Sequence, residues 1–232
     1  MIQLLAITHI FLFSRLLFGN ASSDWILHYP KGLLVIGIIA SVGIIVGRKF
    51  TPVFLIGVVI VWLCFSNKAI RNVSHEFLLW VTFASVFNLR ESRIKLPPNL
   101  YQNGLWLFFG VNYLFSAIEK IKTPQWLHGD ALDILMTTHA ANLSVFSDIL
   151  RALPLTGVSY FILALEFAIL PLAFITSARK WTWLCLMALH VGIGLTFRME
   201  EISLVMLVTQ LALYQKEWFP KLAELPFLRK LA

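Results

Sequence analysis

The amino-acid sequence predicts an all-α integral membrane protein with about eight membrane-spanning helices and a few short helices at the membrane surface. Two observations lead to this prediction. Of the 232 residues, 59% are hydrophobic and only 13% are charged, which is more apolar surface than a soluble core of this size can bury. The apolar residues also fall into separate segments without the period-two alternation of a membrane barrel, so helices are the expected spanning structure.

Eight apolar segments approach the length of about 20 residues that crosses a bilayer as a helix, although several are shorter. In chain order they are residues 2–19, 32–47, 51–66, 76–89, 100–118, 157–177, 181–197 and 202–215. The first has no basic start and no small-residue cleavage site, so we interpret it as a helix rather than a signal peptide. The connection 119–156 contains apolar residues at helical spacing, which predicts one or two short interfacial helices. Residues 1–232 are expected to form a single membrane domain without a soluble domain.

The basic residues predict how these helices are oriented. If both termini lie in the cytoplasm, the cytoplasmic side carries 11 lysines and arginines and the outer side carries 7, as the positive-inside rule favours. The expected location is a bacterial inner membrane, crossed several times. The net charge of +7 comes without an interleaved basic and aromatic surface, so nucleic acid is not an expected partner. Cys64 and Cys185 form no CxxC pattern and are interpreted as buried, inert thiols.

Three ionisable residues, Arg15, Glu166 and His190, lie within apolar segments. A charge at membrane depth costs several kcal/mol unless it finds a partner or water, so these side chains are expected to face the interior of a bundle. Two interpretations are open: an Arg15–Glu166 ion pair with His190 hydrogen-bonded nearby, or a polar cavity that holds a ligand. Haem is a weaker alternative, because the six histidines show no facing pair at helix centres. No metal site is predicted.

A lysine stands where the fifth apolar segment ends. Tyr113, Ala117 and Lys120 are spaced i, i+4 and i+7 and therefore share one helix face. Such a face would line a pocket with an apolar floor, in which Lys120 is kept from water and acts as a base. The alternative is a purely structural role, in which Lys120 ends the helix and extends its amine to the surface. Trp126 likewise fits either a ring-stacking wall or an aromatic belt at the interface.

Four stretches of the chain resemble the HTTM domain family, the membrane domain shared by vitamin K-dependent gamma-glutamyl carboxylase and many bacterial proteins. The stretch "YLFSAIEKIKTPQWLHGDAL" is similar to the family pattern of tyrosine, small residues, lysine, tryptophan and glycine. "RNVSHEFLL" resembles the family's asparagine and histidine at the start of a helix, and "FSRLLFG" suits its first helix. "LHVGIGLTFRMEEISLVMLVTQLALYQKEWFPKL" resembles its histidine-bearing helix and closing segment. The resemblance covers most of the chain.

This resemblance implies a quinol-dependent site on the outer side of the membrane. Lys120 would be the base that deprotonates a vitamin K-like hydroquinone, and His75 would orient the reacting group or stabilise its anion. The other residues expected to bind the ligand are Asn72, Tyr113, Trp126, His190, Glu166 and Arg15. The expected function is thus a carboxylase-like membrane protein that binds a quinol or another lipid-like, small hydrophobic ligand, with the lipid bilayer as its other partner. The alternative is a non-catalytic structural or assembly subunit that packs against partner helices in a larger membrane complex.

Overall fold

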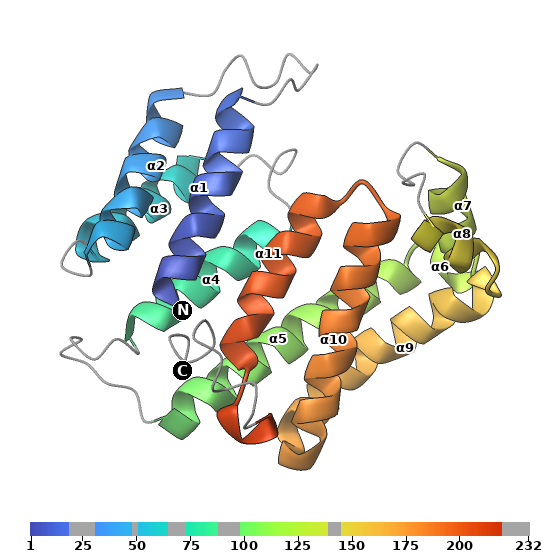
Figure 1. Cartoon of the computed structure of the whole chain (residues 1–232). Coiled ribbons are helices and arrows are strands. Elements are labelled where there is room, and N and C mark those ends of the chain that lie inside the picture. The colour runs from blue at the N-terminus through green and yellow to red at the C-terminus, as the bar shows by residue number, and fades with distance from the viewer. Residues whose placement is uncertain (19–30, 48–50, 65–72, 88–97, 139–144, 220–232) are drawn as a thin grey trace. The chain divides into compact units, whose positions relative to one another are not determined.

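The computed structural model of the chain describes residues 1–18, 31–47, 51–64, 73–87, 98–138 and 145–219. These residues are mostly helical, and they form 11 α-helices and two short 3₁₀ helices (Figure 1). The chain divides into two compact units. One is formed by Met1–Leu96 with Pro220–Ala232, and the other by Pro97–Phe219.

The first unit contains the helices α1 (Ile2–Phe18), α2 (Lys31–Val46), α3 (Thr51–Cys64) and α4 (Val73–Phe87). Helix α2 packs along both α1 and α3 (Figure 1). Gly57 lets α3 approach α2, because a Cβ atom at this position would lie 2.6 Å from the Cβ atom of Ala40. The buried His9 Nε2 atom lies 3.1 Å from the Thr82 hydroxyl oxygen. This hydrogen bond joins α1 to α4 and satisfies a polar group of each helix inside an apolar core.

The second unit is built on four longer helices, which carry the candidate site. They are α5 (Pro98–Ile121), α9 (Leu155–Phe174), α10 (Thr176–Thr196) and α11 (Glu200–Gln210). Helix α5 packs along α9, and α10 packs against both α9 and α11 (Figure 1). The remaining elements are the short helices α6 (Pro124–Leu127), α7 (Ala131–Thr137) and α8 (Val145–Arg151), and the 3₁₀ helices η3 (Leu211–Leu213) and η4 (Lys216–Trp218).

A glycine brings α5 and α9 together. A Cβ atom at Gly110 would lie 2.9 Å from the Cα atom of Leu170, so only a residue without a side chain fits there. The contact is backbone against backbone, and neighbouring long side chains can therefore meet across the interface. Pro171 follows directly in α9 and lacks the N–H group that would continue the hydrogen-bond ladder at this turn.

The number of membrane-spanning helices predicted from the sequence is wrong. Among the described residues, one helix, α9, is both long and apolar enough to cross a membrane. The prediction that the chain crosses a bacterial inner membrane several times, with both termini in the cytoplasm, is wrong with it. Some apolar segments form helices that are too short: the 14 residues of α3 extend about 21 Å, against about 30 Å of hydrocarbon. Others are long but too polar: α5 carries Asn112 and Lys120, and α10 carries Arg179 and Lys180.

Two smaller predictions also differ from the structure. The connection 119–156 contains three short helices rather than one or two, because Gly129, at φ +80°, separates α6 from α7 in a backbone conformation that favours glycine. Cys185 is exposed rather than buried, because it lies on the outer face of α10. The side chain of Cys64 lies outside the part of the chain whose side chains are described.

Candidate functional site

The candidate site begins with one face of α5. Tyr113 and Ala117 are buried on this face, at 4% and 0% exposure. Lys120 lies one turn further on, in the last turn of α5. A cation is favourable there, because the unpaired carbonyl groups give a helix C-terminus a partial negative charge. About a fifth of the Lys120 side chain, 22%, stays exposed. The face therefore runs from the apolar interior to an amine that solvent or a ligand can reach.

Lys120 is paired with a carboxylate from α9. Its Nζ atom lies 2.6 Å from Glu166 Oε1 and 2.7 Å from Oε2, and it also donates to the Ser116 hydroxyl at 2.7 Å. The Glu166 side chain is 6% exposed. Short charge-assisted contacts to both oxygens compensate for taking the two charges out of water. The structure thus gives Glu166 a partner from α5, whereas one interpretation of the sequence paired it with Arg15.

A chain of neutral hydrogen bonds lies deeper in the same unit. The Tyr113 hydroxyl lies 2.7 Å from His190 Nε2 on α10, and it accepts a hydrogen bond of 2.9 Å from the Gln210 side-chain amide at the end of α11. Burial, together with the nearby Lys120 charge, lowers the pKa of His190 to about 4. Burial also raises the pKa of Tyr113 far above its usual value, assisted by the negative charge of Glu166. Both side chains are therefore neutral near pH 7.

Two hydrogen-bond directions are open to neutral Tyr113 and His190. The Tyr113 hydroxyl donates to His190 Nε2 in one imidazole tautomer and accepts from it in the other. In both, His190 Nδ1 is buried without a hydrogen-bond partner, as is Gln210 Oε1. Such orphan atoms are rare inside proteins and mark places where a water molecule or a ligand group is accommodated.

The turn after α5 places an aromatic ring beside Lys120. The Lys120 Nζ atom lies 5.3 Å from the ring centroid of Trp126 in α6, within the range of a cation–π contact. The Tyr160 hydroxyl of α9 donates to the Leu127 carbonyl at 2.7 Å and holds α6 in place. Gly129 allows the chain to turn away after α6, since its φ of +80° disfavours residues with a side chain. Trp126 is partly exposed, so part of this residue is accessible to a ligand.

The structure brings together five of the eight residues that the sequence suggested for the site. These are Lys120, Tyr113, Trp126, Glu166 and His190. Asn72 lies outside the described residues. His75 lies in α4 and Arg15 in α1, both in the first unit, and their side chains lie outside the described part.

Sequence reasoning missed two residues of the cluster. Gln210 is an uncharged polar side chain that is fully buried near the end of an apolar helix, and such a residue signals an interior hydrogen bond. Ser116 lies four residues before Lys120 and shares its helix face. Over the described ranges, histidine, cysteine and acidic side chains form no group of three or more that would hold a metal ion.

Comparison with known proteins yields no relative. No family model, curated protein or solved structure matches the chain.

Proposed function

We propose that the second unit binds a small amphipathic ligand with an acidic hydroxyl group, such as a quinol, beside Lys120, and that the Lys120–Glu166 pair accepts its proton. The observation that carries the proposal is the pair itself. It joins a nearly buried carboxylate to an amine that remains 22% exposed, under an indole ring 5.3 Å away. A purely structural ion pair needs neither the open side of the amine nor the ring.

The pair can receive a proton without creating a second unpaired charge. When a ligand hydroxyl gives its proton to the Glu166 carboxylate, the O–H bond of the ligand breaks and an O–H bond forms on Glu166. The Lys120 ammonium then faces the new ligand anion in place of the carboxylate. Because the surroundings are apolar, the attraction between the ammonium and the ligand anion is stronger than it would be in water. Glu166 is therefore the proton acceptor, and Lys120 stabilises the anion.

The neutral chain beneath the pair supports this assignment. Tyr113 and His190 contribute no charge near pH 7, so Lys120 and Glu166 have only each other or the ligand as ionic partners in the described interior. Trp126 is partly exposed and offers a ring on which a flat ligand ring can stack. The proposal gives Glu166 the role of base that the family resemblance gave to Lys120, and gives Lys120 the anion-stabilising role that the resemblance gave to His75.

Binding of a reduced naphthoquinone by the full-length protein in detergent tests this function. We expect calorimetry to show at least a tenfold loss of affinity for Lys120→Met combined with Glu166→Gln, since the double change removes both charges together and leaves no buried carboxylate unpaired. The matched control is Lys122→Met, which alters a lysine paired with Glu119 on the exposed side of α5. Unchanged affinity in the folded double variant would contradict the proposal.

A second candidate function is a non-catalytic subunit that packs against partner helices. The observation in its favour is the uncovered apolar face of α2, where Ile36, Ile39 and Val46 are 49%, 65% and 76% exposed. Contiguous exposed apolar residues mark interaction surfaces. Purification in a mild detergent separates the candidates, because a stoichiometric partner that elutes with the chain, together with no quinol binding, would favour the subunit.

A further inference from the structure

The corner between α9 and α10 concentrates positive charge. Arg179 and Lys180 lie in the first turns of α10, and the sequence contains no aspartate or glutamate between Glu166 and Glu200. The N-cap residue of α10, Ile175, supplies no side-chain acceptor for the first N–H groups of the helix, which adds to the positive potential there.

Arg179 is a buried cation whose charge no described acid neutralises. The residue is 7% exposed, and its Nε atom donates to the Ala173 carbonyl at 2.8 Å, near the end of α9. This bond uses one of the five N–H donors of the guanidinium. The ion pairs of the described residues involve other side chains. Burying a cation without a neighbouring anion costs free energy. A negatively charged group that accepts hydrogen bonds from the remaining donors of Arg179 would lower this cost.

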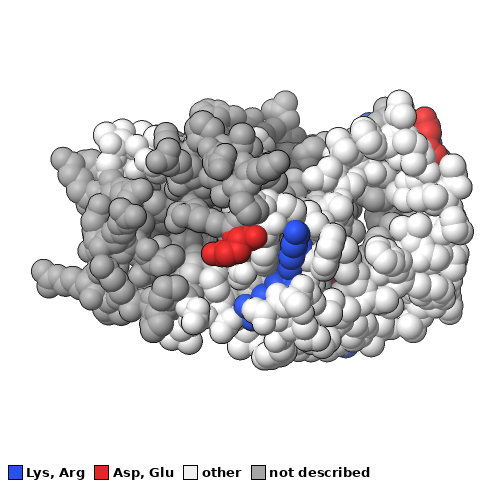
Figure 2. All heavy atoms as spheres, turned by 60° about the horizontal axis from the view of Figure 1, so that its bottom comes forward, with Lys and Arg blue, Asp and Glu red and all other residues white. Residues whose placement is uncertain are grey.

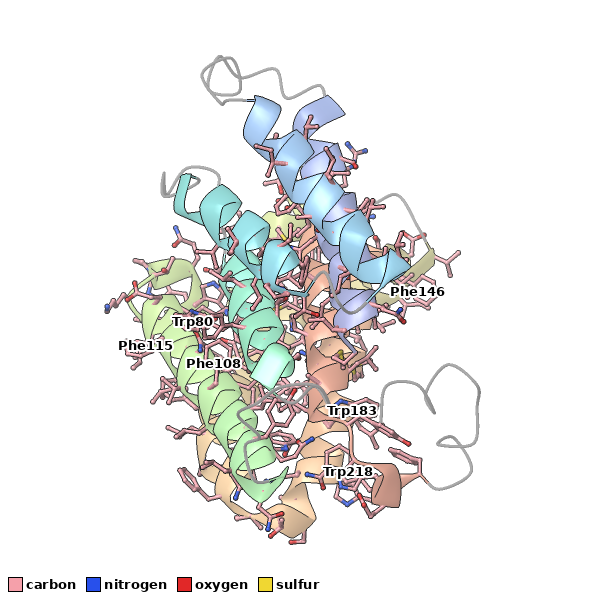
Figure 3. All side chains as sticks on the ribbon, turned by 90° about the vertical axis from the view of Figure 1, so that its left-hand side faces the viewer. Trp80, Phe108, Phe115, Phe146, Trp183 and Trp218 are labelled. Atoms are coloured by element: carbon pink, nitrogen blue, oxygen red, sulfur yellow. The ribbon has the colours of Figure 1, made fainter. Side chains whose placement is uncertain are left out.

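Aromatic side chains surround this charge. The Arg179 guanidinium carbon lies 5.7 Å from the Trp106 ring centroid, and Lys180 Nζ lies 4.5 Å from that of Phe219. Trp183 and Trp218 lie next to each other in the same aromatic cluster, with ring centroids 5.9 Å apart (Figure 3). These rings hold the cations in position by cation–π contacts but do not neutralise them.

Large apolar side chains stand exposed beside the two cations. Phe174, Ile175 and Trp181 are 70%, 50% and 65% exposed. Basic residues flanked by exposed tryptophan and aliphatic side chains are typical of a surface that meets lipid headgroups with its charges and acyl chains with its apolar side chains. A free inorganic anion would gain nothing from these apolar neighbours.

We propose that the α9–α10 corner binds the phosphate group of an anionic phospholipid, with Arg179 and Lys180 contacting the phosphate oxygens and the exposed apolar residues contacting the acyl chains. This lipid site is independent of the site at Lys120. Arginine suits it because its planar set of donors matches two phosphate oxygens at once. The bound phosphate also supplies the anion that Arg179 lacks among the described residues.

Native mass spectrometry of the full chain in detergent tests the site. Phosphatidylglycerol and phosphatidylcholine with identical acyl chains are titrated separately, and inorganic phosphate is added as a competitor. We expect at least a fivefold preference for phosphatidylglycerol, and a fivefold loss of affinity for it in Arg179→Gln, the change expected for one basic residue at an anionic surface. Glutamine can still donate to the Ala173 carbonyl, so the helix corner is preserved.

Two further variants make the outcome decisive. Arg198→Gln removes an exposed charge just after the other end of α10 and is expected to keep the preference. If Arg179→Gln does not fold, as judged by circular dichroism, Lys180→Gln provides the same measurement. Equal affinity for the two lipids, or equal loss in Arg198→Gln, would overturn the site. Complete displacement of the lipid by inorganic phosphate would overturn the assignment to a lipid and indicate a free-anion site.

Discussion

His190 shows how a buried side chain makes stability depend on pH. Folding removes the imidazole from water and places it against the Tyr113 hydroxyl, and its pKa falls from 6.5 to about 4. The unfolded chain therefore binds a proton more tightly than the folded chain between these two pH values. A group with a lowered folded-state pKa stabilises the fold above its unfolded pKa, and this contribution is lost as the pH falls towards the folded one.

We predict that the free energy of unfolding decreases by up to about 3 kcal/mol as the pH falls from 6.5 to 4, since each pKa unit corresponds to about 1.4 kcal/mol. Denaturation of the wild type and of His190→Gln, measured from pH 8 to pH 4, checks this. Glutamine can hydrogen-bond to the Tyr113 hydroxyl but does not titrate, so the difference in the free energy of unfolding between the two proteins should change by about 3 kcal/mol between pH 8 and pH 4. A difference that is constant across the range would contradict the lowered pKa.

The sequence indicates which polar residues are buried better than it indicates which of them interact with one another. The i, i+4, i+7 spacing placed Tyr113, Ala117 and Lys120 on one face, and the structure has that face turned inward for the first two. Polar residues in apolar segments also signalled that Glu166 and His190 face the interior. The sequence did not predict the ion pair, because Lys120 and Glu166 are 46 positions apart in the chain. Spacing along the chain gives the face of a helix, and packing alone decides its neighbour.

At the level of elements, the close approach of α5 and α9 depends on a missing side chain. Gly110 faces the backbone of Leu170, whereas Gly104, two turns earlier on the same helix, has no atom of another residue within 4 Å of its Cβ position. The two glycines have the same cost in helix propensity but different surroundings. They therefore form a natural pair of test positions.

We predict opposite effects for alanine at the two positions. Gly110→Ala should lower the free energy of unfolding by about 1–3 kcal/mol, because the new methyl group pushes against a backbone atom that can move only with the whole helix. Gly104→Ala should raise it by up to about 1 kcal/mol through helix propensity. Chemical denaturation of both variants in the same detergent checks the prediction. Stabilisation by both would mean that α5 and α9 do not touch at Gly110.

The apolar segments were correctly predicted to be helices, but most of them were wrongly predicted to span a membrane. Apolar periodicity identifies a helix whichever solvent it meets. Crossing a membrane requires sufficient length and apolar composition in one and the same helix, and most segments here have only one of these. α10 illustrates the problem, because it begins near Thr176 and includes Arg179 and Lys180, whereas the apolar run alone begins at Trp181.

At the level of the whole molecule, apolar side chains are found both inside and outside. The described part of the surface in Figure 2 is almost entirely uncharged. In α9, 22% of the most apolar 18-residue window is buried, whereas the core helix of a soluble protein would be buried over most of its length. Among the described helices α9 is therefore the candidate for contact with lipid, and Glu166 is turned away from its exposed side against α5.

We predict that a charge on the exposed side of α9 removes the protein from membranes. Phe161 is 62% exposed in this helix, and Phe161→Lys should reduce the share of the chain in the carbonate-resistant membrane fraction several-fold, because a lysine near the centre of a bilayer costs about 3 kcal/mol. Phe161→Leu serves as the apolar control and should behave as the wild type. If α9 does not contact lipid, the lysine variant will fractionate as the wild type does.

The division into two units was not visible in the sequence. Both units have the same apolar composition. The charged stretch at residues 90–95 precedes the boundary, but Arg48 and Lys49 also separate two helices of the same unit, so charge alone does not indicate a boundary. The boundary follows from which helices contact one another, such as α5 with α9 and α2 with α1 and α3. Such contacts depend on side-chain fit at residues like Gly57 and Gly110, and a hydrophobicity pattern does not contain that information.

The bond from the Tyr160 hydroxyl to the Leu127 carbonyl has a mechanical consequence. It attaches α6, and with it the Trp126 indole, to the same helix that provides Glu166. A sliding or tilting of α9 relative to α5 would carry the carboxylate and the indole along together and leave the Lys120 amine behind. Such a movement of α9 would thus weaken the contacts of the amine with Glu166 and Trp126 together, and would leave its hydrogen bond to Ser116 on α5 in place.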